Sequence, residues 1–298
     1  MDICKELDLA IMEKETHGNP SVQAGYSVDG RIYKNYLSKN CWNDFKKEMQ
    51  MNHAEAFNTY GKGGGKEMDE RKACGNIYPP KMASFGSSSR MIYNLMKENK
   101  AFQYEKKLAT VVGGMANLDG YFEDDQKRVF VEAKCREPYA SGSNLVAKAY
   151  DSLFVALSES DSNNLSCVVK PAEKEGKICA DFSVGDIPLN HFDIKQIICH
   201  FLGIANDVLK SGDQRKIEFI YLLYNPTALK FDEPKVGEKI QRIYALECKE
   251  CAAVDFPALF FDILNYLQKV HKIGIEKNVS ELSKGFSFRL CDQNNMKI

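Results

Sequence analysis

The stretch of sequence that decides the fold is NLDGYFEDDQKRVFVEAK, residues 117–134. Two runs rich in β-branched and aromatic residues, 117–123 and 128–134, flank a polar break that begins with Asp, a residue favoured at the first position of a tight turn. We therefore predict a β-hairpin whose turn is centred between Asp125 and Gln126. In such a hairpin, paired residues have numbers that sum to 251.

This register sorts the hairpin residues into two faces. The residues of one face are apolar or glycine and predict a core face: Leu118, Gly120, Phe122, Val129, Val131 and Ala133. The pairs of the other face include two that are favourable across strands: Tyr121–Phe130, Glu123–Arg128, Asn117–Lys134 and Asp119–Glu132. Because a slip of one residue would mix the two faces, the sorting itself supports the register.

The pair of Asp119 with Glu132 is electrostatically unfavourable, because directly opposed side chains have Cβ atoms roughly 5 Å apart. A divalent cation between the carboxylates would offset the repulsion; alternatively one carboxyl is protonated or pairs with Lys134, which projects from the same face. Mg²⁺ suits such a site because it takes carboxylate ligands and keeps several waters. An exposed, solvated acidic and basic face is the remaining alternative.

The arrangement of Asp119 and the tripeptide 132–134 on neighbouring strands resembles the D…(D/E)xK signature of the PD-(D/E)xK nuclease superfamily, which includes type II restriction endonucleases and RecB-like nucleases. Leu118 stands where the nominal motif has Pro. The segments 87–89, 104–108 and 134–139 look like a restriction-endonuclease-like branch found in bacteria, and the resemblance covers about residues 85–225. It implies an α/β (α+β) fold with an αβββαβ core, in which helices flank a mixed central sheet.

By this resemblance, Asp119 and Glu132 bind Mg²⁺, for which Mn²⁺ would substitute, and the backbone carbonyl of Ala133 is a further metal ligand. Lys134 is then the catalytic cation, which binds the scissile phosphate or steadies the attacking water. The resemblance thus implies a Mg²⁺-dependent deoxyribonuclease that hydrolyses DNA phosphodiester bonds. The alternative is a non-catalytic nucleic-acid-binding or scaffold protein that keeps the nuclease fold.

Further site residues follow from the same resemblance. Glu105 is the preferred candidate for an additional acidic catalytic residue, with Glu98 as the second choice. Lys195 and Gln196, at the start of a predicted helix, match the place where related nucleases direct polar residues toward nucleic acid, although an ordinary helical turn fits equally well. Lys107 belongs to a basic group upstream of the hairpin that could follow a phosphate backbone or serve only solubility.

The rest of the chain predicts an N-terminal helical extension and linker over residues 1–80 and a nuclease-like domain over residues 81–298. Residues 31–58 are expected to form one or two helices, and the glycine run at 61–67 a hinge. The further helices are expected from the serines at 87–89 to about 98, at 144–158, after Asp193 to about 210, and near 235–250 and 257–271. Strands are expected at 104–112 and 217–224, and residues 159–190 are weakly patterned and suggest an insertion.

Composition limits the cellular location and the partners that we expect for the protein. The chain has no stretch of eighteen apolar residues and no secretory signal pattern, so we expect a cytoplasmic protein without a membrane partner. A net charge of −1 is unlike that of a protein that coats DNA, but an enzyme needs only a local basic groove. A homodimer would suit double-strand cleavage. We expect His191 and His200 to be ordinary satisfied or exposed histidines, because neither has a second histidine at metal-binding spacing.

Overall fold

The predicted hairpin lies in the middle of a five-stranded mixed sheet. The computed structural model describes residues 2–62, 67–140 and 144–296. The sheet order is β13 (Phe286–Asp292), β12 (Lys216–Leu223), β7 (Lys127–Lys134), β6 (Met115–Glu123) and β5 (Gln103–Ala109). β5, β6 and β7 form an antiparallel meander, whereas β12 runs parallel to both β7 and β13. The mixed sheet predicted from the sequence is therefore confirmed.

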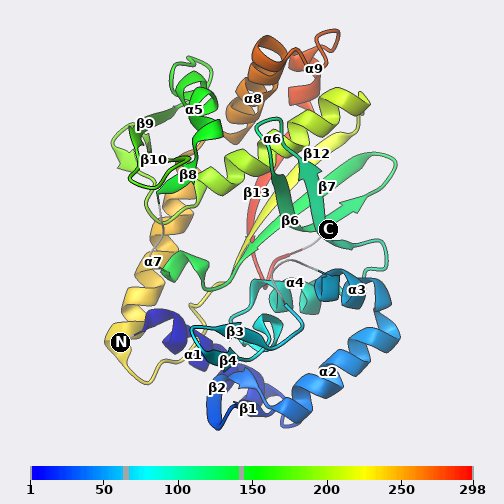
Figure 1. Cartoon of the computed structure of the whole chain (residues 1–298), viewed down its shortest axis with the longest axis vertical. Helices are drawn as coiled ribbons and strands as arrows, with labels where there is room; N and C mark the ends of the chain where they lie inside the picture. The colour runs from blue at the N-terminus through cyan, green and yellow to red at the C-terminus, as the bar shows by residue number, and fades with distance from the viewer. Residues whose placement is uncertain (1, 63–66, 141–143, 297–298) are drawn as a thin grey trace.

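Helices cover both faces of this sheet (Figure 1). α4 (Ser88–Met96) packs on one face, where Ile92 joins Val129 and Val131 in one apolar cluster. α6 (Ile194–Ser211) and α8 (Phe256–His271) cover the other face, where Phe201 and Phe260 pack with Phe130. Of the elements expected from residue 87 onward, α4, β5, β6, β7, α6 and β12 are present in the expected order, and the segment between β7 and α6 contains further elements.

The hairpin register is as predicted over four pairs, from Gly120 with Val131 to Glu123 with Arg128. Below Gly120 the ladder stops, so the predicted pairs of residues 117–119 with residues 132–134 do not form. Instead, a carboxylate oxygen of Asp119, Oδ2, accepts the backbone N–H of Ala133 at 2.8 Å. The hairpin therefore opens at the end where the carboxylates lie.

The strand β6 changes face at Asp119, which corrects the predicted sorting. Leu118 packs in the cluster under α6, whereas a side chain at Gly120 would meet Phe102 on the α4 side at 2.1 Å. The neighbouring strand is irregular at the same level, because Glu105 has a φ of 52° and is skipped in the ladder of β5 with β6. Such an irregularity redirects a side chain without ending the sheet.

The face that was predicted to be polar is not open to solvent. Tyr121, Phe130 and Glu132 are all at most 2% exposed, because α6 lies over them. The aromatic pair of Tyr121 and Phe130 is confirmed, with ring centroids 4.9 Å apart. Burial on both faces of β7 follows from the helices, since α4 covers one face and α6 covers the other.

The N-terminal region contains strands as well as the predicted helices. Its elements are α1 (Ile3–Gly18), β1 (Ala24–Val28), β2 (Arg31–Leu37), α2 (Lys39–Asn52), α3 (Ala54–Lys62), β3 (Arg71–Ala73) and β4 (Asn76–Tyr78). The helix expected from residue 31 is wrong for residues 31–37, because these residues form β2, which pairs with β1. Asp29 and Gly30 have positive φ angles, 52° and 70°, as in a tight hairpin turn, and an Asp-Gly dipeptide is a known signal for such a turn.

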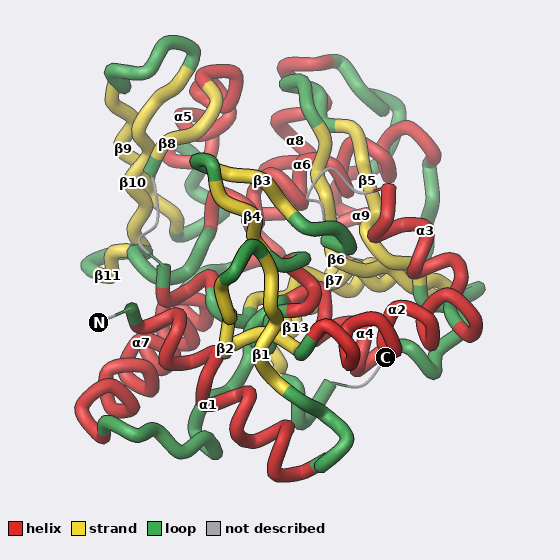
Figure 2. Tube along the Cα trace, turned by 60° about the horizontal axis from the view of Figure 1, so that its bottom comes forward, coloured by secondary structure: helices red, strands yellow, loops and turns green. Residues whose placement is uncertain are grey.

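Buried contacts tie the N-terminal region to the sheet. Asp8 of α1 is fully buried and accepts hydrogen bonds from Arg136 at 2.9 Å, Asn35 at 2.8 Å and Ser84 at 3.2 Å. α1 also lies beside α7 (Pro234–Ala253), as both views show (Figures 1 and 2). Arg136 follows β7 by two residues, so this contact anchors the end of the strand that carries the candidate site. Residues 63–66 of the predicted hinge lie outside the described residues.

The segment predicted as an insertion forms a small antiparallel sheet with the residues before it. Its strands are β8 (Leu145–Ala147), β9 (Leu165–Pro171), β10 (Lys177–Val184) and β11 (Ile187–Pro188). The helix predicted over 144–158 is shorter, because only α5 (Asp151–Ser158) is α-helical, after the 3-10 turn η3 (Lys148–Tyr150). The remaining elements are α9 (Val279–Lys284) and the 3-10 turns η1 (Lys81–Ala83) and η2 (Glu137–Tyr139). None of the helices within the described ranges is long and apolar enough to cross a membrane.

Candidate active site

A stripe of four residues on α6 faces the hairpin. Spacings of four, three and four residues place them along one side of the helix: Gln196, His200, Gly203 and Asp207. A side chain at Gly203 would lie 2.6 Å from the Cβ atom of Ala116, so the glycine lets helix and sheet approach closely. The polar members of the stripe meet the polar residues of β7 at its two ends. Asp193 caps the helix by accepting the backbone N–H of Gln196 at 3.3 Å, as predicted.

At the C-terminal end of β7, three side chains form a closed set of hydrogen bonds. The ammonium of Lys134 lies 2.7 Å from Glu132 Oε1 and donates to the side-chain oxygen of Gln196 at 2.5 Å. The amide nitrogen of Gln196 donates to Glu132 Oε1 at 2.7 Å. Glu132 is 2% and Lys134 7% exposed. The structure therefore brings together three of the residues that the sequence singled out: Glu132 and Lys134 form a buried ion pair, and Gln196 hydrogen-bonds to both.

Glu132 is held in its ionised form. Burial alone would raise the pKa of its carboxyl, but Lys134 and His200 outweigh this and hold it at about 2. His200 Nε2 lies 3.0 Å from Glu132 Oε2. Burial acts in the opposite direction on Lys134, whose pKa is nevertheless raised, chiefly by Glu132.

His200 is therefore part of the site, and the expectation of an ordinary histidine missed it. It is 2% exposed, and its Nδ1 atom has no hydrogen-bond partner within the described residues. The available signal was its position four residues after Gln196, on the same side of an amphipathic helix. The metal-pair criterion could not find it, because His200 contacts a carboxylate and not a second histidine.

Asp119 is the less stabilised of the two carboxylates. Burial and the charge of Glu132 raise its pKa well above the usual value, although Lys134 and the N–H of Ala133 act against this. Of the two predicted ways to offset the repulsion, the pairing of Glu132 with Lys134 is present in the structure. The raised pKa of Asp119 favours protonation of the second carboxyl.

The donor set at this end of the hairpin fits Mg²⁺ in kind. No group of three or more His, Cys, Asp or Glu side chains is placed to hold a metal in the ranges described above. The protein ligands would be Asp119, Glu132 and the carbonyl of Ala133, and Mg²⁺ accepts one or two carboxylates with water in its other positions. Glu132 Oε2 is buried and lies 3.0 Å from His200 Nε2, so a cation bound to this oxygen would replace that contact.

The other predicted site residues differ in their contacts with this set. Glu105 is on the strand next to Asp119, with its pKa raised by burial, and no hydrogen bond or ion pair joins it to Glu132 or Lys134 among the interactions described. Lys107 is exposed on β5 opposite Asn117 and lies outside the set. Lys195 lines a cleft beside Lys134. Of the three predicted nucleic-acid contacts, Gln196 bonds to the candidate catalytic residues Glu132 and Lys134.

This cleft has a volume of about 160 Å³ and lies between the end of β7, the start of α6, β10 and α7. Glu247 of α7 lines it and is 1% exposed. The hydroxyl of Tyr221 donates to Glu247 Oε1 at 2.6 Å, and burial raises the pKa of Glu247 to about 8. A carboxyl that keeps its proton at neutral pH therefore lies close to the ion pair.

The raised pKa of Glu247 predicts a pH-dependent stability. Between its usual pKa, 4.5, and about 8, the folded state keeps the Glu247 proton and the unfolded state has lost it, so the free energy of unfolding falls as pH rises. Glu247→Gln cannot ionise and keeps an acceptor for Tyr221. We expect it to be more stable than the native protein by on the order of 2–4 kcal/mol near pH 8.5 and about equal near pH 4.5.

Urea unfolding at both pH values measures this difference. Glu238→Gln on the exposed side of α7 is the matched control and should follow the native protein throughout. Equal stability of Glu247→Gln and the native protein at high pH would contradict the assigned protonation of Glu247.

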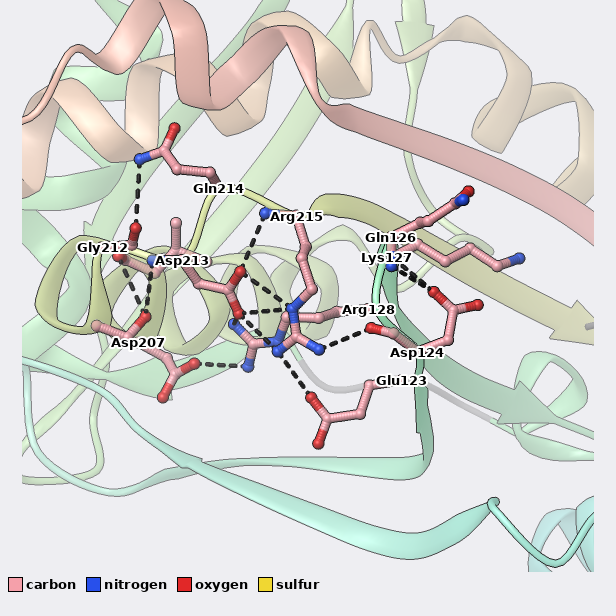
Figure 3. Close-up of polar contacts among 12 residues, drawn as sticks. Glu123, Asp124, Gln126, Lys127, Arg128, Asp207, Gly212, Asp213, Gln214 and Arg215 are labelled. Atoms are coloured by element: carbon pink, nitrogen blue, oxygen red, sulfur yellow. Dashed lines mark hydrogen bonds and ion pairs between the residues drawn. The ribbon is translucent and has the colours of Figure 1, made fainter.

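A second polar cluster holds the other end of the hairpin (Figure 3). Arg128 donates to Asp207 at 2.6 Å and to the Tyr121 hydroxyl at 3.0 Å. Arg215 lies beside it and contacts Glu123 at 2.8 Å and Asp213 at 2.7 Å. Glu123 and Arg128 are ladder partners as predicted, but their hydrogen bonds go to other residues. The cluster fastens the hairpin turn to the end of α6 and to the loop before β12.

The set at the C-terminal end of β7 combines two carboxylates, a buried ammonium and a side-chain amide within a mixed α/β fold. Carboxylates can hold a hard cation, and an ammonium next to them can bind a phosphate or neutralise developing charge. Comparisons of the chain with protein-family models, with curated proteins and with solved structures found no match.

Proposed function

We propose that this protein is a metal-dependent nuclease with a restriction-endonuclease-like core that hydrolyses phosphodiester bonds of DNA. The observation that carries the proposal is the contact of Lys134 with Glu132 and Gln196 beside Asp119, at the open end of the central hairpin. The order α4, β5, β6, β7, α6, β12 supports it, because it is the core that the motif implies.

Each residue of the set has a role in this proposal. Asp119, Glu132 and the carbonyl of Ala133 would hold Mg²⁺, which when bound lowers the pKa of a coordinated water and neutralises charge on the phosphate. Lys134 binds the phosphate, since an ammonium has three donors and the described residues use two of them. Gln196 bonds to both members of the ion pair and fixes the position of the ammonium.

A specific observation also favours the alternative of a non-catalytic nucleic-acid-binding or scaffold protein. Glu132 and Lys134 are buried and satisfy each other, as a purely structural ion pair would. The two functions differ in their response to metal. A nuclease site of this kind should be stabilised by Mg²⁺ or Mn²⁺ through mass action, by about 2.7 kcal/mol at a concentration one hundred times the Kd.

Asp119→Asn is the variant that tests the proposal with least damage to the fold. Asparagine keeps an oxygen that accepts the N–H of Ala133 and removes the repulsion from Glu132, so we expect an unchanged or higher melting temperature. We expect cleavage of labelled DNA with Mg²⁺ to fall by roughly 100-fold or more, because one of two carboxylate ligands is lost. The stabilisation by Mg²⁺ should disappear with it.

Asp125→Asn, in the exposed hairpin turn, is the control for loss of one carboxylate and should cleave as the native protein does. A native protein that binds DNA but shows neither cleavage nor a metal-linked rise in melting temperature would support the scaffold function. Cleavage that survives Asp119→Asn would overturn the assigned site.

A further inference from the structure

The cleft beside Lys134 has the size of a single ring. Its volume is about 160 Å³, and a cavity of roughly 150 Å³ in another protein holds one benzene molecule. Lys134 lines the cleft, whereas Asp119 and Glu132 do not. The cleft therefore adjoins the proposed site of phosphate hydrolysis without being part of the proposed metal site.

Apolar and polar side chains line the cleft together, and Glu137, Asp181 and Asp193 add acidic groups to the lining. Phe182, Leu189 and Phe192 line it from β10 and the loop before α6, and all three are buried. Asn190 and His191 lie between them and supply hydrogen-bonding groups. A nucleobase fits such a lining, since its two faces pack against apolar or aromatic groups and its edges form hydrogen bonds.

The loop that carries Asn190 and His191 is held in place by one buried carboxylate. Glu250 of α7, 4% exposed, accepts the backbone N–H groups of His191 at 2.7 Å and of Phe192 at 2.9 Å. It also lies 2.8 Å from His191 Nδ1. A proton on Nδ1 satisfies this contact and makes the other ring nitrogen an acceptor. This part of the lining is thus organised before any ligand binds.

Glu247 offers the cleft a group whose hydrogen bonding is incomplete. Its Oε1 atom accepts from Tyr221, but its Oε2 atom is buried and has no hydrogen-bond partner in the described part of the chain. An unsatisfied buried polar atom is costly, so a ligand that bonds to it gains free energy. A protonated carboxyl has a donor and an acceptor side by side, and the Watson–Crick edge of each base offers the complementary pair.

We propose that this cleft binds the base of one unstacked nucleotide, with the phosphate of that nucleotide at Lys134. The ammonium of Lys134 has one donor left after its bonds to Glu132 and Gln196. A base must leave its stack to enter the cleft, which is unfavourable in a paired duplex and costs least in a single strand. If the protein is the nuclease proposed above, its preferred substrate is single-stranded or carries an unpaired nucleotide.

The binding step is tested without metal and without cleavage. Deoxyadenosine and deoxycytidine monophosphates are titrated into the full chain in the presence of EDTA, with deoxyribose 5-phosphate as the probe that lacks a base. The nucleotides should bind at least tenfold more tightly than the sugar phosphate. Ala140→Trp, at an exposed position lining the cleft, should weaken nucleotide binding at least tenfold.

Two further variants keep this test decisive. Ala252→Trp, the same substitution on an exposed side of α7 away from the cleft, should bind as the native protein does. Asn190→Trp fills the cleft from the opposite rim and replaces Ala140→Trp if that variant fails to fold. Binding that is absent from the native protein, or that is unaffected in a folded variant with a filled cleft, overturns the proposal.

Cleavage assays separate this inference from the proposed function on which its second half rests. With Mg²⁺, a single strand or a duplex with one unpaired nucleotide should be cut at least tenfold faster than a perfect duplex, and Ala140→Trp should remove the preference. Cleft-dependent nucleotide binding without any cleavage would support the cleft and overturn the nuclease. Equal cleavage of all substrates, unchanged in Ala140→Trp, would support the nuclease and overturn the cleft.

Discussion

Lys134→Met is expected to lower the free energy of unfolding by about 3–5 kcal/mol and to abolish cleavage. The substitution keeps most of the side-chain volume but removes the ammonium, so Glu132 remains as a buried charge whose main partner is lost. Glu132 is 2% exposed, and its pKa of about 2 shows how strongly its ionised form depends on its cationic neighbours. Urea unfolding and DNA cleavage with Mg²⁺ measure the two effects.

The double variant Lys134→Met with Glu132→Gln separates the structural effect from the catalytic one. Removing both charges should recover most of the lost stability, to within about 1–2 kcal/mol of the native protein, because no unpaired charge stays buried. Cleavage should stay absent, since the proposed catalytic cation and a proposed metal ligand are both gone. Native-like stability of the single variant would contradict the buried ion pair, and cleavage by the refolded double variant would contradict the proposed chemistry.

This expectation differs from the one that the motif alone suggests. The D…ExK signature alone suggests that Lys134 can be replaced without harm to the fold. Burial changes that view, because the same ammonium compensates Glu132 beneath α6. The sequence contains both residues at the correct spacing, but the cover over them comes from a helix sixty residues later, and hydrophobic alternation cannot predict which helix lies there.

Part of the hairpin register was predictable from the sequence. Charge, aromatic and apolar sorting predicted the four ladder pairs from Gly120 with Val131 to Glu123 with Arg128. The same rule failed below Gly120 because β6 changes face at Asp119, next to the irregular backbone at Glu105. The irregularity depends on the backbone conformation of the neighbouring strand at Glu105, which residue patterns at 117–134 do not encode.

The residue patterns of the sequence do not predict the cleft. Glu247 and Glu250 belong to α7, more than one hundred residues after Lys134, and neither forms a motif with it. Their importance comes from burial and from the contacts with Tyr221 and His191. Two glutamates three residues apart on a charged helix predict a solvated face. Only the packing of α7 against η2, β11 and the loop before α6 makes them part of the site's surroundings.

Arg128→Ala is expected to destabilise the protein by about 3 kcal/mol through the other end of the hairpin. The guanidinium lies over the rings of Tyr121 and Phe130, at 5.7 and 5.2 Å from their centroids, and is 6% exposed on its side chain. Alanine removes this packing, the bond to the Tyr121 hydroxyl and the bond to Asp207. The turn would then be joined to the end of α6 by fewer contacts.

Arg128→Met divides this effect into packing and charge. Methionine keeps contact with both rings, so a loss of about 1 kcal/mol or less would mean that packing provides the larger part. Asp207→Asn is the matched control for the ion pair; because Asp207 is 39% exposed, water can solvate it, and we expect a loss below about 1 kcal/mol. An Arg128→Ala variant as stable as the native protein would contradict this role. A loss of stability confined to Arg128→Ala would mean that packing of the side chain on the two rings provides the stabilisation. Because this cluster lies at the opposite end of β7 from Lys134, cleavage by the folded fraction of each variant should stay close to the native rate, and a change in that rate would reveal coupling along the strand.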